Sequence, residues 1–101
     1  MGDRLELHEV FCNILGSRRA YFQPPESVKM QYPAIIYSRS NIENVFANNS
    51  VYGQHEAYEV VVVYEDPDSD LPREISRLPL CRFDRHYVAD NLNHDTFTLY
   101  Y

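Results

Sequence analysis

The sequence predicts an α+β domain in which two helices pack against a mostly antiparallel β-sheet. Three patterns predict it: an amphipathic helical stripe near the N-terminus, two β-patterned runs in the centre, and an alternating C-terminal tail with a cluster of turn-forming residues. The chain has 101 residues, which suffices for one modest core but not for two. We therefore expect residues 1–101 to form a single domain.

The first predicted helix covers residues 3–15. Its apolar side chains recur at three- and four-residue steps, and they are Leu5, His8, Phe11, Cys12 and Leu15, with Leu7, Val10 and Ile14 widening the face. Asp3 can cap the start of the helix, and Gly16 stands where a left-handed residue ends one. The wide face predicts packing on a sheet and contact with a second surface, such as another subunit.

The centre of the chain predicts strands separated by a long loop. Residues 21–25 end in two prolines, so we expect an edge strand or a loop there. Residues 30–38 and 58–64 are β-patterned, and the second run is apolar on both faces, which predicts a strand that is covered on both sides by helices or by a neighbouring subunit. Residues 40–55 are rich in Asn and have no helical stripe, so we expect a long loop, typical of a contact element.

A short helix and a hairpin complete the predicted fold. Asp70 is a suitable N-cap, Leu71, Ile75 and Leu78 form a stripe, and Pro79 ends the helix. Residues 80–101 alternate in the manner of a β-hairpin, with the turn expected within residues 90–95.

Composition excludes several classes of function. The net charge of −6 argues against a nucleic-acid surface, since phosphate binding needs clustered basic side chains. No apolar run approaches the roughly 20 residues of a membrane helix. The N-terminus is charged and lacks the apolar core of a signal peptide, so we expect folding in a reducing cytoplasm. Cys12 and Cys81 are then most simply core residues. The nine Tyr residues suit half-buried sheet edges and subunit contacts.

Two clusters suit a metal, and each also has a structural interpretation. The first comprises His86, Asp90, His94 and Asp95, whose types suit a divalent ion but whose setting is typical of a hairpin turn. The second comprises Asp66, Asp68 and Asp70, which imitate the start of a calcium loop. Leu71 and Arg77 replace the Gly and Glu that such a loop needs, so these carboxylates more simply cap a helix. No nucleophile motif is present, and we expect neither catalysis nor a cofactor nor a bound metal.

Several motifs spread over most of the chain together resemble one group of proteins. They are Tyr32-Pro33-Ala34-Ile35-Ile36-Tyr37, Ala47-Asn48-Asn49-Ser50-Val51-Tyr52, Tyr58-Glu59-Val60-Val61-Val62 running into Asp66-Pro67-Asp68-Ser69, and Arg85-His86-Tyr87-Val88-Ala89-Asp90-Asn91-Leu92-Asn93-His94-Asp95 with Phe97 and Leu99-Tyr100-Tyr101. They are similar to the small tail-terminator and tail-completion proteins of long-tailed bacteriophages. None of them is a catalytic signature.

The resemblance implies a structural virion protein of the phage neck. Such proteins assemble in the host bacterial cytoplasm into a ring, commonly a hexamer, that caps the tail tube and joins it to the head connector, with DNA only as passing cargo. An acidic ring would repel that DNA from the channel wall. The chain is shorter than many tail terminators, so a head-closure or stopper protein is an alternative, as is a small inhibitor module that binds one host protein. We expect subunit or tail contacts at Asn44, Phe46, Asn48, Asn49, Tyr52, Arg85, His86 and Asn91.

Overall fold

The computed structural model describes residues 4–24, 31–47 and 50–101, and along residues 41–55 it describes the backbone. Its elements are, in chain order, α1 (Arg4–Leu15), β1 (Ala20–Phe22), β2 (Ala34–Ala47), β3 (Ser50–Tyr64), α2 (Leu71–Ser76), β4 (Cys81–Ala89) and β5 (Leu92–Tyr100). The strands form one five-stranded sheet in the order β1-β2-β3-β5-β4. β1 runs parallel to β2, and every other pairing is antiparallel. The predicted α+β class is thus confirmed.

The predicted loop over residues 40–55 is wrong, because these residues continue the two central strands. β2 and β3 stay paired from Ala34↔Val63 out to Ala47↔Ser50, with irregularities between Arg39 and Asn41 and between Val45 and Phe46. The physical reason is that β-branched and aromatic residues, which favour strands, are spread among the Asn residues. These strand-favouring residues are Ile42, Val45, Phe46, Val51 and Tyr52.

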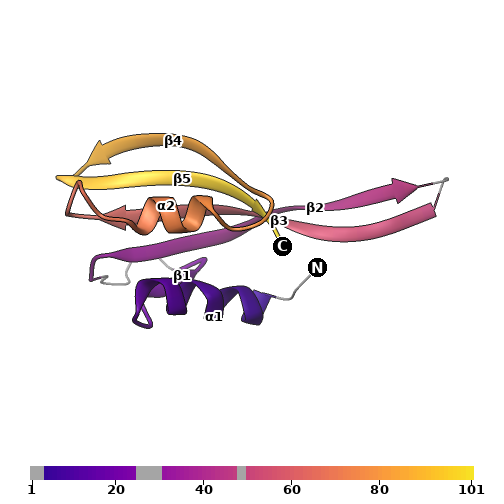
Figure 1. Cartoon of the computed structure of the whole chain (residues 1–101), viewed down its shortest axis with the longest axis horizontal. Coiled ribbons are helices and arrows are strands. Elements are labelled where there is room, and N and C mark those ends of the chain that lie inside the picture. Colours follow the sequence, from indigo (N-terminus) through magenta and orange to yellow (C-terminus); the bar gives the residue numbers. More distant parts are fainter. Residues whose placement is uncertain (1–3, 25–30, 48–49) are drawn as a thin grey trace.

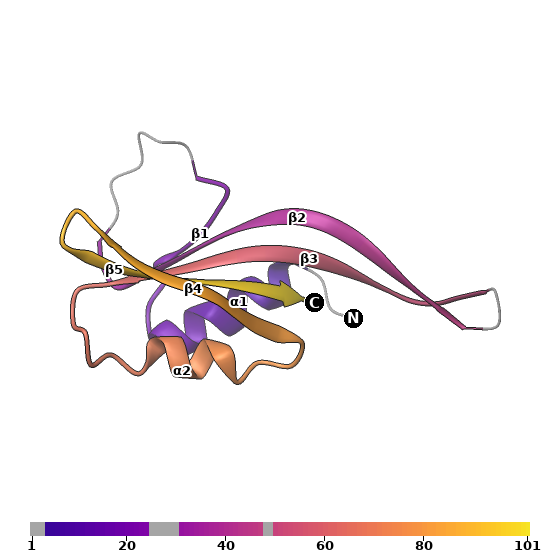
Figure 2. The same cartoon turned by 90° about the horizontal axis from the view of Figure 1, so that it is seen from above.

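A two-stranded ribbon therefore projects from the body of the molecule (Figures 1 and 2). β1 pairs with β2 only at residues 35–37, and β5 pairs with β3 only from Ala57 to Tyr64. Beyond these limits, residues 41–47 of β2 pair with residues 50–57 of β3 and with no other described strand. We call residues 41–47 together with residues 50–56 the arm. The arm explains the elongated shape, whose principal extents are 49 × 24 × 22 Å.

Helix α1 buries part of the predicted apolar face. Leu7, Phe11 and Cys12 are buried, whereas Leu5 is 66% exposed. Gly16 ends the helix as predicted: it has φ +70°, a conformation that favours glycine, and its N–H donates to the carbonyl of Cys12 at 2.9 Å.

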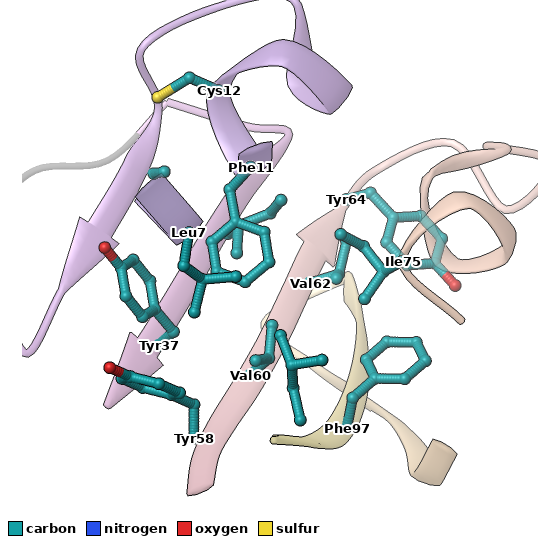
Figure 3. Close-up of a cluster of buried hydrophobic side chains, with 13 residues drawn as sticks. Leu7, Phe11, Cys12, Tyr37, Tyr58, Val60, Val62, Tyr64, Ile75 and Phe97 are labelled. Atoms are coloured by element: carbon teal, nitrogen blue, oxygen red, sulfur yellow. The ribbon is translucent and has the colours of Figure 1, made fainter. Parts of the chain in front are cut away.

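Both helices pack on one face of the sheet, and the core lies between (Figure 3). The buried cluster comprises Leu7, Phe11, Cys12, Ala20, Ile35, Tyr37, Tyr58, Val60, Val62, Tyr64, Ile75, Phe97 and Leu99. β3 is the middle strand of the sheet, which accounts for its run of valines. The expectation that this run is covered on both sides holds only in part. Val63 is buried and Val61 is half-buried, but within the described residues no helix lies on their face.

The C-terminal hairpin is confirmed, with a tighter turn than predicted. Asp90 and Asn91 have φ values of 54° and 62°, as a type I′ turn requires, and β5 already begins at Leu92. Helix α2 is also shorter than predicted, since it ends at Ser76, and its N-cap residue Asp70 makes no side-chain capping bond. β2 begins at Ala34, four residues after the predicted start of that strand at Met30.

Candidate functional site

The arm is the first candidate site, and it carries three of the predicted contact residues. Asn44 pairs with Gln54 and Phe46 with Val51, and Tyr52 lies on the same stretch of β3. Asn48 and Asn49 lie outside the described residues. Apart from Glu56, whose backbone bonds to Tyr101, the arm pairs along its outer edges with no other described strand, so its outward N–H and C=O groups there can pair with another chain. The arm is thus a pairing surface rather than a loop.

Polar contacts fix the root of the arm to the body. The hydroxyl of Tyr58 donates to Glu56 Oε2 at 2.6 Å, and Arg39 Nη2 lies 3.0 Å from the same oxygen. Burial and the bond to Glu56 raise the pKa of Tyr58, so its hydroxyl stays a donor at neutral pH. The backbones of Glu56 and Tyr101 exchange two hydrogen bonds, of 3.0 and 3.3 Å. These contacts fix the position of the base of the arm relative to the body.

The second candidate site is strand β4, which lies on the free edge of the sheet. It carries the predicted contact residues Arg85 and His86, and Asn91 lies in the turn that follows. Most of its side chains are exposed, including Phe83 at 52% and Val88 at 63%. Figure 1 shows the β4–β5 turn at the opposite end of the molecule from the arm. Within one chain, the predicted contact residues therefore fall into two separate groups.

A buried carboxylate, Asp95, lies behind this edge, whereas the sequence analysis placed it in a metal cluster or a hairpin turn. Asp95 is only 5% exposed, and it accepts a hydrogen bond from the Tyr64 hydroxyl at 2.7 Å on Oδ2. His86 Nδ1 donates to the other oxygen, Oδ1. Burial raises the pKa of Tyr64 to about 12, and the adjoining carboxylate adds to the rise. The pairings Val62↔Asp95 and His86↔Asp95 place Asp95 between strands rather than in a turn.

The other face of the hairpin carries a stack of a cation and two rings. The Arg85 guanidinium lies 4.8 Å from the centre of the Tyr87 ring, and that ring stacks on His94 at 4.7 Å and 11°. His94 Nδ1 donates to the carbonyl of Leu92 at 3.0 Å. His94 and His86 consequently point to opposite faces of the sheet.

The metal interpretations gain no geometric support within the described residues. No three His, Cys, Asp or Glu side chains there are placed to hold an ion. His86 and Asp95 bond each other, while His94 lies on the opposite face. Asp66 accepts the backbone N–H of Asp68 at 2.9 Å, as a turn residue does. Cys12 and Cys81 are both free thiols, as two core residues would be.

Comparison with protein-family models, with curated proteins and with solved structures finds no match for this chain. In the part of the chain that the structure describes, neither helix is long and apolar enough to cross a membrane.

Proposed function

We propose that the protein is a structural subunit that assembles with further copies of itself and performs no catalysis. The single observation that carries this proposal is the arm. A two-stranded ribbon is at best marginally stable in water, and its open edges are templates for pairing with another chain. Residues 41–56 include Ile42, Val45, Phe46 and Val51, for which a two-stranded ribbon has no core of its own. Contact with a neighbouring subunit would supply that burial.

Within this class, we propose a tail-terminator ring of a phage neck. The support is the resemblance of the motifs described above, and an arm that projects from the body suits a ring because it can reach the next subunit. The proposed partners are the tail tube protein and the head-connector proteins, and the proposed location is the virion. The net charge of −6 is compatible with DNA that passes through the ring without binding. A head-closure protein remains the alternative within the same neck.

Light scattering on the purified protein over a hundredfold concentration range tests the assembly proposal. A discrete oligomer, seen as closed rings by negative-stain electron microscopy, is the expected result. A strict monomer at every concentration contradicts self-assembly and favours a small inhibitor module that binds one host protein through an exposed edge.

Binding to isolated phage parts separates the two neck roles. A tail terminator should bind one end of tail tubes that lack their terminator, and it should leave isolated head connectors unbound. The reverse preference identifies a head-closure protein. Binding to neither, by a protein that forms rings, contradicts the neck assignment while leaving self-assembly intact.

A further inference from the structure

The two edges of the sheet differ in how well they are protected. β1, at one edge, has three residues and is followed by Gln23 and Pro24, and short strands with a nearby proline are poor templates for pairing. β4, at the other edge, has nine residues, and most of its side chains are exposed. No described strand pairs with its outer side. β4 is therefore the long open edge of the body.

The hairpin turn determines which backbone groups of β4 face outward. Ala89 and Leu92 flank the two-residue turn, and residues in that position form a hydrogen-bonded pair. Pairs alternate along an antiparallel ladder, so the next pair, Val88 and Asn93, directs its N–H and C=O groups away from the partner strand. Val88 thus presents on the outer side a donor and an acceptor that no described strand pairs with, together with an exposed apolar side chain.

An arm cannot pair with β4 of its own chain. The arm continues β2 and β3 away from one end of the body, while β4 and its turn extend toward the other end (Figure 1). The strand register also places the two surfaces at opposite ends of β3. Tyr64, at one end of β3, pairs with Asn93 beside the β4–β5 turn, whereas the arm lies beyond Ala57 toward the other end. Any pairing between the two surfaces must therefore join two molecules.

The chemistry of the two surfaces is complementary. Residues 41–55 contain one carboxylate, Glu43, and neither Lys nor Arg. β4 exposes Arg85 and also Arg82, which pairs at 3.1 Å with Asp84, the one carboxylate of this strand. The exposed Phe83 and Val88 of β4 also match the apolar residues in the sequence of the arm.

We propose that β4 is the edge that receives the arm of a second copy, so that the sheet continues from one subunit into the next. This inference rests on the proposed self-assembly and adds the surface that the arm binds. The contact is heterologous, since two different surfaces meet, and such contacts close into a ring or extend as a filament. Backbone hydrogen bonds supply the pairing, and the side chains of β4 select the partner.

Two variants each remove one half of the contact. In the first, residues 43–55 are replaced by Asn-Gly, which keeps the pair Ile42↔Glu56 and closes it with a tight turn. In the second, Val88→Pro removes one outward N–H on an edge strand, where proline is tolerated. Val88→Thr is the matched control, because it keeps the N–H and the β-branched shape. Val88→Lys, an edge-protecting change at an exposed site, replaces Val88→Pro if circular dichroism shows that the latter is unfolded.

Light scattering should show that the arm-truncated variant is a monomer. Val88→Pro should need roughly tenfold or more protein to assemble, since the contact loses a backbone hydrogen bond and leaves its acceptor unpaired. Val88→Thr should assemble as the unchanged protein does. An equimolar mixture of the two disabled variants should form heterodimers and nothing larger, because the first retains a receiving edge and the second retains an arm.

The experiment distinguishes a failure of the proposed contact at β4 from a failure of the proposed self-assembly. If the unchanged protein assembles and both Val88→Pro and Val88→Lys assemble equally well, β4 does not receive the arm and self-assembly stands. If the mixture yields no heterodimer, the contact is arm to arm or edge to edge, and the inference is overturned. If the unchanged protein is a monomer throughout, the proposed self-assembly and this inference fail together.

Discussion

Removing one hydroxyl group from the buried network behind β4 should destabilise the fold measurably. Tyr64 is 5% exposed, and its hydroxyl donates to the carboxylate of Asp95, which is equally buried. Tyr64→Phe keeps the ring and its packing against the core, but it leaves the carboxylate of Asp95 with the bond to His86 and without the bond from Tyr64. A hydrogen bond to a charged group contributes about 1.5–3 kcal/mol, so we expect a loss of that size in the free energy of unfolding at pH 7.

The burial of Tyr64, together with its bond to Asp95, predicts a pH dependence of stability with a definite sign. The pKa of Tyr64 is raised from 10.0 to about 12, so the folded state holds this proton more tightly than the unfolded state does. The resulting stabilisation is fully present below pH 10 and is lost as the pH rises from 10 to 12. The shift corresponds to about 2–3 kcal/mol. The stability advantage of the unchanged protein over Tyr64→Phe should therefore shrink across that range.

Urea unfolding followed by circular dichroism, at pH 7 and at steps from pH 9 to pH 11.5, measures both effects. Tyr21→Phe on the short edge strand β1 is the control, and we expect it to change the free energy of unfolding by less than about 0.5 kcal/mol. Equal stability of Tyr64→Phe and the unchanged protein at pH 7, or a difference between them that is constant with pH, would refute the reasoning.

Three further changes test other parts of the fold. Phe11→Ala, at a fully buried position between α1 and the sheet, should cost about 3–5 kcal/mol in urea unfolding, and a cost below 1 kcal/mol would contradict the packing. Glu56→Ala removes the acceptor shared by Tyr58 and Arg39 and should weaken assembly more than it weakens the fold, as light scattering and unfolding together would show. Cys81, whose pKa burial raises to about 11, should react with iodoacetamide at pH 8 roughly tenfold or more slowly than in urea, measured by mass spectrometry.

The locally encoded elements could be predicted from the sequence. The stripe before Gly16 and the alternation on either side of Asp90 and Asn91 are patterns of neighbouring residues, and the helix and the hairpin that they predict are present. Leu5 is exposed and Leu7 is buried because only the packing partner decides which side of a wide apolar face turns inward. That information lies in the sheet and not in the helix.

The arm and the buried carboxylate could not be predicted, because both depend on pairing between distant residues. Residues 40–55 look polar and loop-like, yet β2 and β3 hold each other in register as far as Ala47 and Ser50. Asp95 is of a residue type that is common in turns, and it follows a cluster of such residues. The register of β5 with both neighbouring strands nevertheless buries it between Tyr64 and His86. The predicted contact residues Arg85, His86 and Asn91 do lie at an exposed edge and turn, and their role in contacts stays a prediction.

Hydrogen exchange measured at two protein concentrations, one below and one above assembly, tests the central claim that the arm is the assembly contact. We expect backbone amides of residues 41–47 and 50–55 to exchange quickly at the low concentration and to become protected at the high one, with β4 gaining protection in parallel. Amides of β5, which is paired on both sides within one chain, should exchange equally at both concentrations. Arm amides that exchange at the same rate in the monomer and in the assembled protein would contradict the claim.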